Sequence, residues 1–285
     1  MKLATPFSFI LAFFSIACQA TELIWISNEN IGRPFNADPV KGSELLSHTL
    51  VEHLEDIDLV NIQSGDRRAL KLLNELPNAC TGRKLINKER AAIYHTSLLP
   101  HILFPAPRLY SHKPLAVKEP VIKNINSLNG AISDLTLGIN KERLFTEEVM
   151  ALLNKLEPAN VYEYSGATSA ATVVSLFSKG RVSLVLEYPN VFKHFSSADP
   201  NGGLYKTYVY RVLPNGYFTR GHIVCAKSEQ GKKLINALDL AIEKASKTKV
   251  YFNTHLKYIP KEEHGAFAAL YNSLYKTNFS THQAH

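Results

Sequence analysis

The sequence lacks the short motifs that identify many enzymes. It contains no Gly-x-Ser-x-Gly nucleophile turn and no His-Glu-x-x-His zinc motif. The glycine-rich phosphate-binding patterns Gly-x-x-x-x-Gly-Lys and Gly-x-Gly-x-x-Gly are also absent. Its histidines are scattered, and none of them pairs with a cysteine or a carboxylate at the spacing of metal ligands. We therefore expect a protein that is not an enzyme and that uses no metal and no cofactor.

Long runs of one residue type are also missing. No apolar run after residue 20 is long enough to cross a bilayer. The net charge is +7, yet no run of five or more Lys or Arg occurs. We expect neither stable membrane insertion of the mature chain nor a nucleic-acid partner, and we interpret the excess of positive charge as a solvated basic surface.

The first twenty residues have the composition of an export signal. A positive charge at Lys2 precedes an apolar run at 7–16, and small residues stand at Cys18 and Ala20. We expect a signal peptide that is cleaved near Ala20 and a periplasmic protein. Acylation of Cys18, which would make the protein a lipoprotein, is the less favoured alternative because the usual leucine three residues before the cysteine is absent.

Cysteine is scarce. The chain has three, of which two remain if the signal peptide is removed. Cys80 and Cys225 would then form an even pair in an oxidising compartment, which predicts a disulfide. The alternative is two buried thiols that never meet.

The order of apolar and amphipathic segments predicts an α/β fold. Buried strands are expected at 23–27, 59–62 and 79–81, and the helices between them are expected to begin near Ser43 and after Ser64. This alternation favours a parallel sheet with helices on both faces.

A second series of strands and helices is expected between residues 135 and 188. The proline- and lysine-containing segment 111–129 is expected to cross from a first lobe to a second, and the extended stretch 206–213 to return. A last helix is expected around 262–275. The predicted division is a signal peptide at 1–20, lobe one at 21–112 and 204–262, lobe two at 113–203, and a C-terminal helix and tail at 263–285.

The stretch from Pro77 to Tyr110 carries a resemblance to a known family. Asn87-Lys88-Glu89-Arg90 is similar to a Thr-Pro-Glu-Arg step, and Thr96 to His101 is similar, with one extra residue, to Phe-Ser-x-Pro-Tyr. In this order the motifs resemble those of the bacterial extracellular solute-binding proteins of family 3, the amino-acid-binding type, in a divergent branch. The predicted elements are a strand at 79–81, a polar turn at 82–84, a helical step through Lys88 and Arg90, a strand at 93–95 and an extended run to Tyr110.

The resemblance implies a two-lobed fold of the type II periplasmic binding proteins, with a ligand cleft between lobes that are joined by two crossings. It implies capture of a small solute, amino-acid-like or anionic, for an ABC importer or a membrane sensor. Leu85, His101 and Ser183 depart from the family pattern. An alternative is therefore a binding-protein scaffold that has lost its ligand site and acts as a protein-interaction or signalling module. A cell-wall hydrolase on the same scaffold is a lesser alternative.

Three candidate ligand contacts lie in lobe one. The resemblance implies that Arg90 binds a ligand carboxylate and that Phe35, in the loop after the first strand, covers the apolar part of the ligand. The alternatives are an arginine paired with an acidic side chain and an ordinary core aromatic. Arg83, in the predicted polar turn, either adds charge to the cleft or points to water.

Three further candidates lie in lobe two. Glu187 and Tyr188 end a predicted strand, and Gly166 stands where a predicted helix begins, so that nearby backbone amides would be available to an anion. Position alone suggests these three residues.

Overall fold

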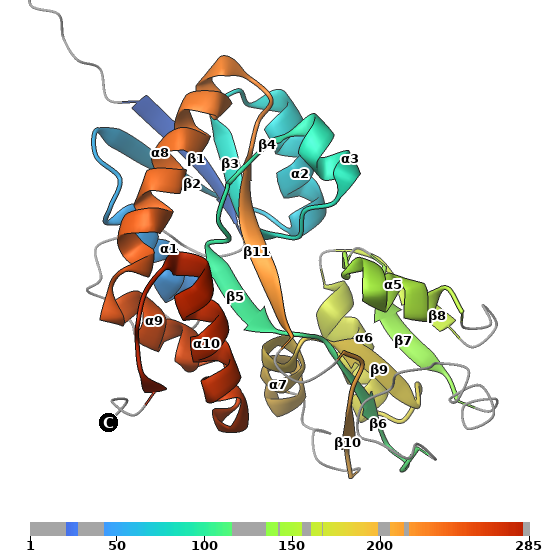
Figure 1. The fold of residues 1–285 in the computed structure, drawn as a ribbon. Helices are drawn as coiled ribbons and strands as arrows, with labels where there is room; N and C mark the ends of the chain where they lie inside the picture. The colour runs from blue at the N-terminus through green and yellow to red at the C-terminus, as the bar shows by residue number, and fades with distance from the viewer. Residues whose placement is uncertain are drawn as a thin grey trace, which may run out of the picture.

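The computed structural model shows two lobes, each built on its own β-sheet (Figure 1). Both lobes combine parallel strands with helices, so the predicted two-lobed α/β fold is confirmed. The structure describes residues 21–27, 43–115, 135–141, 143–155, 161–166, 168–198, 206–213 and 217–281.

The sheet of lobe one has the order β2-β1-β3-β11-β4, and β5 extends β11 beyond this path. β1 is parallel to β2 and β3, as predicted from the strand–helix alternation, whereas β11 returns antiparallel to β3. The strands are β1 (Thr21–Ser27), β2 (Ile57–Gln63), β3 (Ala79–Lys84), β4 (His95–Thr96), β5 (Ile102–Pro105) and β11 (Phe218–Cys225).

Cys80 and Cys225 form a disulfide across the middle of this sheet. The two residues are direct partners in the pairing of β3 with β11, and their Cα atoms lie 4.0 Å apart. The predicted disulfide is therefore confirmed, and it joins strands that are 145 residues apart in the chain.

Helices cover both faces of the sheet in lobe one. Alternate side chains of a strand point to opposite faces, so Trp25 enters the main core while Ile26 packs against α2. The main core lies under α1, α8, α9 and α10. The helices are α1 (Ser43–Val51), α2 (Asp66–Glu75), α3 (Lys88–Ile93), α8 (Glu229–Ser246), α9 (Lys249–Leu256) and α10 (His264–Tyr275), with a short 3₁₀ turn, η2 (Lys261–Glu263), before α10.

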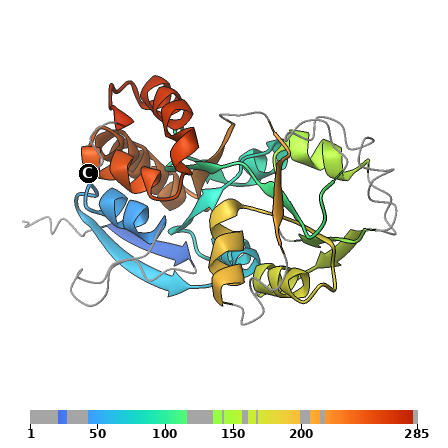
Figure 2. The same ribbon diagram turned by 90° about the horizontal axis from the view of Figure 1, so that it is seen from below.

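The C-terminal helix, predicted as a separate segment, is part of lobe one. Phe267 and Tyr271 of α10 are fully buried in the main core. In the view from below, the C-terminal helices gather over lobe one, away from helix α5 (Glu147–Leu153) of lobe two (Figure 2). Helix α10 therefore completes the core of lobe one.

The sheet of lobe two has the order β10-β6-β9-β7-β8. β7 is parallel to β8 and β9, and β6 is antiparallel to β9 and β10. The elements are β6 (Arg108–Ser111), β7 (Leu137–Asn140), β8 (Val161–Tyr164), β9 (Leu184–Glu187), β10 (Tyr208–Arg211), α5 (Glu147–Leu153), α6 (Ser169–Ser178) and α7 (Pro189–Ala198).

The chain passes between the lobes at positions other than the predicted lobe limits of 112/113 and 203/204. β6 and β10 fall within the ranges expected for lobe one, yet both pair in the sheet of lobe two. The physical reason is visible at Pro105 and Pro107, which have no N–H to donate to a ladder. The extended run breaks there into β5 and β6, so the outgoing crossing is 106–107 and the chain returns between β10 and β11.

The predicted polar turn at 82–84 is wrong, because β3 continues through Lys84. The register with β11 shifts between His222 and Val224, and Arg83 has a φ of 60°, so the strand contains a bulge here. A Cβ on Gly82 would lie 2.6 Å from Nε2 of His101, so only glycine fits at this point.

Three other local expectations also needed correction. The expected strand at 93–95 starts later, since Ile93 ends α3 and β4 is His95–Thr96. Helices α7 and α9 were not expected from the sequence.

Several predictions fall outside the described residues. They are the signal peptide with Cys18 and Ala20, the aromatic contact Phe35, and most of the segment 111–129. Among the helices that the structure describes, none has the length and apolar character needed to span a membrane.

Candidate functional site

Arg90 lies near the start of the short helix that follows β3. Asn87 caps this helix, because its side-chain oxygen accepts a hydrogen bond from the backbone N–H of Arg90 at 2.8 Å. The guanidinium Nη1 of Arg90 donates to the carbonyl oxygen of Leu85 at 2.6 Å. The half-buried Arg90 side chain is therefore oriented at the carboxyl end of β3 by its own stretch of backbone.

Arg83 is placed by the bulge in β3. Its backbone N–H donates to Nε2 of His101 at 3.1 Å, so the proton of the neutral His101 ring sits on Nδ1. Burial, assisted by the neighbouring His222 and Arg83, holds the pKa of His101 well below its usual value. The backbone of Arg83 is thus fixed by a neutral histidine, close to the segment that carries Arg90.

Glu187 ends β9 and is only 2% exposed. One carboxylate oxygen accepts a hydrogen bond from Nη2 of Arg143 at 3.1 Å, and the other accepts from the backbone N–H of Tyr188 at 2.8 Å. Burial raises the pKa of Glu187, whereas the charge of Arg143 acts in the opposite direction. Both oxygens are therefore engaged inside lobe two.

Tyr188 packs at the junction between the lobes. Its ring meets Phe104 of β5 edge-on at 5.0 Å between centroids, and the guanidinium of Arg143 lies over it at 5.6 Å. Tyr188 is 4% exposed, and burial raises the pKa of its hydroxyl. In this conformation Tyr188 joins the two lobes rather than facing solvent.

Gly166 follows β8 and leads into α6. It is exposed and has a φ of +118°, which favours glycine. Its carbonyl accepts from the N–H of Ser169, whose hydroxyl donates to the side chain of Asn140 at the end of β7. Because β8 lies two strands from β9, we expect Gly166 about 10 Å from Glu187 along the carboxyl edge of the sheet.

The structure therefore divides the candidate residues between the lobes. Arg83 and Arg90 lie at the carboxyl end of β3 in lobe one, whereas Glu187, Tyr188 and Gly166 follow strands of lobe two. A ligand that contacted both sets would have to bridge the lobes. The crevice outside the carboxyl ends of parallel strands is also where α/β proteins commonly bind ligands.

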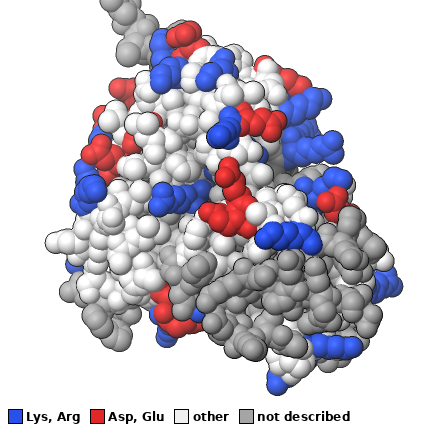
Figure 3. All heavy atoms as spheres, turned by 45° about the vertical axis from the view of Figure 1, so that its right-hand side comes forward, with Lys and Arg blue, Asp and Glu red and all other residues white. Residues whose placement is uncertain are grey.

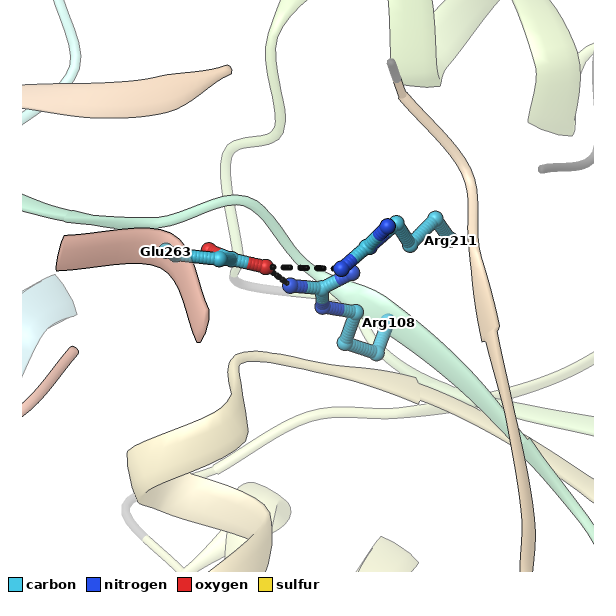
Figure 4. Close-up of polar contacts among 3 residues, drawn as sticks. All are labelled: Arg108, Arg211 and Glu263. Carbon is cyan, nitrogen blue, oxygen red and sulfur yellow. Dashed lines mark hydrogen bonds and ion pairs between the residues drawn. The ribbon is translucent and has the colours of Figure 1, made fainter. Parts of the chain in front are cut away.

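Sequence reasoning did not identify a buried charged cluster at the lobe junction (Figure 4). Nη2 of Arg108 and Nη2 of Arg211 both donate to the same carboxylate oxygen of Glu263, the Arg211 bond measuring 3.4 Å. Their side chains are 11%, 24% and 6% exposed, respectively. The available signal was an arginine directly after the proline pair at 105 and 107.

Exposed charges of both signs are mixed on the face that Figure 3 shows. Lys and Arg are interspersed with Asp and Glu over the described surface in Figure 3, in keeping with the expected dispersed basic surface. In the part of the chain that the structure describes, no group of three or more His, Cys, Asp or Glu is placed to hold a metal ion.

Comparison with known proteins gives a match by structure alone. The sequence matches no protein-family model and no curated protein. A structure from work on glutathione import by Streptococcus mutans through a cystine ABC importer matches with a TM-score of 0.62 and 14% identity, covering 86% of this chain and 99% of that one.

Two further solved structures are similar. One is a histidine kinase sensor domain with similarity to periplasmic binding proteins, with a TM-score of 0.62 and 10% identity, covering 85% of this chain and 97% of that one. The other is an ancestral amino-acid-binding protein described as a precursor of cyclohexadienyl dehydratase, with a TM-score of 0.58 and 13% identity, covering 84% and 96%. The chain thus has the periplasmic-binding-protein fold, and the similar structures include amino-acid-binding proteins.

Proposed function

We propose that this protein is an exported solute-binding protein that captures a small solute between its lobes. The solute is an anionic or amino-acid-like molecule, and the partner is an ABC importer or a membrane sensor. Similar solved structures come from work on an ABC importer and from a histidine kinase sensor domain, which supports these partner classes.

The observation that carries the proposal is the placement of Arg90. A guanidinium offers a planar fork that suits a carboxylate, and a half-buried position strengthens such a pair relative to one in open water. Arg90 has this position at the carboxyl end of β3, on a segment whose backbone is capped by Asn87. Its orientation by the carbonyl of Leu85 means that little side-chain freedom is lost when a ligand arrives.

The side chains near the proposed site favour a negatively charged solute. Glu187 is the carboxylate that position alone suggested for a ligand contact, but Arg143 and the N–H of Tyr188 already engage both its oxygens. We therefore assign Glu187 a role in orienting Arg143 and Tyr188. A negative charge on the solute, held by Arg90 with Arg83 nearby, is the feature of the ligand that the site supports best.

Binding would act on the relative position of the lobes. A ligand favours a conformation only through contacts that it makes there and not elsewhere. A solute held by Arg90 in lobe one and by groups near Gly166 or Tyr188 in lobe two makes its full set of contacts only when both sets surround it. Domain closure around a ligand is a common consequence of such an arrangement.

A melting-temperature screen of the purified protein against amino acids, organic acids, polyamines and small peptides tests the proposal. A solute present at one hundred times its Kd should stabilise the protein by about 2.7 kcal/mol, and we expect carboxylates but not polyamines to do so. The solute should be recovered unchanged, because we propose no reaction. If no solute shifts the transition, the result contradicts the proposal and favours the alternative of an interaction module built on this scaffold.

A further inference from the structure

We propose that Glu263 is a latch between the lobes: its carboxylate, anchored in lobe one, holds Arg108 and Arg211 of lobe two and so favours the relative lobe orientation seen in this structure. The two chain crossings are covalent connections. The latch is a charged, non-covalent connection at the same junction, beside the aromatic contact of Tyr188 with Phe104, and it goes beyond the capture of a solute.

The two arginines mark the lobe-two ends of both crossings. Arg108 is the first residue of β6, directly after the outgoing crossing, and Arg211 is the last residue of β10, directly before the return. They stand opposite each other in the antiparallel pairing of these strands, so their side chains share one face. Two like charges at such a pair of positions repel unless a counter-charge lies between them.

Glu263 supplies that counter-charge from the other lobe. It ends η2, and α10 begins at the next residue. Phe267 and Tyr271 of α10 are fully buried in the core of lobe one, so the backbone that carries Glu263 cannot follow lobe two freely. Figure 4 shows the carboxylate reaching from η2 toward both guanidinium groups.

Rotation of the lobes away from this orientation separates the three side chains. It would leave a carboxylate whose side chain is 6% exposed without its partners and two facing arginines without the carboxylate that both of them contact. Charge-assisted hydrogen bonds of this kind change the ratio of two conformations by roughly 10- to 150-fold. The relative orientation of the lobes should therefore be restrained by Glu263, whether or not a solute is bound.

Distance measurement between spin labels on the two lobes tests the latch. Cysteines introduced at two exposed helix positions, Lys88 in lobe one and Glu147 in lobe two, carry the labels in a Cys18→Ser background, while the native disulfide stays buried. Without solute, we expect one narrow distance distribution for the unmodified latch and a shifted or broadened one for Glu263→Gln. Glu262→Gln, at the exposed neighbouring position, is the matched control and should keep the narrow distribution.

A second variant tests the latch independently, in case Glu263→Gln does not fold. Arg211→Gln changes the most exposed member of the cluster and should broaden the distribution in the same direction, and the double variant should add little to either single change. If both variants fold and keep the wild-type distribution, the latch is refuted, even if their melting temperatures fall. Because no solute is present, this result is separate from the test of the proposed function.

Discussion

The two lobes share a strand–helix alternation but are stabilised in different ways. In lobe one, a disulfide joins the central strands β3 and β11, and the aromatic faces of α9 and α10 complete a large apolar core. In lobe two, the strand ends next to the crossings carry buried charges, Glu187 with Arg143 and the two arginines held by Glu263. Lobe two has apolar cores of its own, so the lobes differ in what is added to them: a disulfide in lobe one and buried charge pairs near the crossings in lobe two.

The largest expected effect comes from removing the covalent link of lobe one. Replacing Cys80 and Cys225 together by alanine opens a loop of 145 residues, and the chain-entropy model assigns such a loop about 4–5 kcal/mol of stability. Urea unfolding followed in both lobes should show that the lobe-one transition moves to lower urea while the lobe-two transition stays close to its original position. An unchanged lobe-one transition would contradict this account of the sheet.

Breaking the charge pair of lobe two should have the next largest effect. Arg143→Ala leaves the carboxylate of Glu187, whose side chain is 3% exposed, without its charged partner. Loss of one partner of a buried pair destabilises a protein by about 3–5 kcal/mol. Urea unfolding should show this loss in the transition of lobe two.

The matched control is an exposed pair in the same lobe. Lys141 and Glu163 lie 2.7 Å apart, with side chains that are 62% and 45% exposed. Lys141→Ala should lower stability by only about 0–1 kcal/mol. If the two substitutions cost the same, burial is not what makes the Arg143 pair important.

Lowering the pH should destabilise lobe one more than lobe two, with a somewhat smaller effect than the substitutions above. Burial lowers the pKa of His255 in lobe one to about 4. Between pH 6.5 and 4 the unfolded chain therefore binds a proton that the folded protein does not, and about 3 kcal/mol of stability is lost as the pH falls. Burial lowers the pKa of His101 as well, so it acts in the same direction.

Glu187 responds to acid in the opposite sense. Burial raises its pKa, so the folded protein takes up this proton before the unfolded chain, and the contribution of Glu187 to stability increases as the pH falls toward 4.5. Lobe one should therefore unfold in acid before lobe two. His255→Gln should flatten the pH dependence of the lobe-one transition, whereas His194→Gln, at an exposed position in lobe two, should leave it unchanged. Equal slopes in the two variants would refute the assignment.

The sequence predicted those features that depend on neighbouring residues. The apolar runs at 23–27 and 59–62 form β1 and β2, and the step at Asn87 begins a capped helix that carries Arg90. The disulfide could be predicted because only two cysteines, Cys80 and Cys225, follow residue 20. In each case the information lies in a short segment or in a count.

The features that were missed depend on contacts between distant residues. An extended segment such as Arg108–Ser111 has the same local pattern whichever sheet it joins, so the sequence could not assign β6 to lobe two. Arg143 and Glu187 are 44 residues apart, and Arg108 and Glu263 are 155 apart. The bulge at Gly82 also depends on the distant ring of His101.

The central claim is that Arg90 holds a negatively charged group of a solute. Calorimetry with a solute found in the melting screen tests it most directly, on Arg90→Ala beside Lys88→Ala, which removes one exposed positive charge from the same helix. We expect Arg90→Ala to weaken binding by about 2–5 kcal/mol, roughly 30- to 5000-fold in Kd, and Lys88→Ala to leave it within a few-fold. If Arg90→Ala folds normally and binds as tightly as Lys88→Ala, Arg90 is a structural residue and the proposed site is wrong.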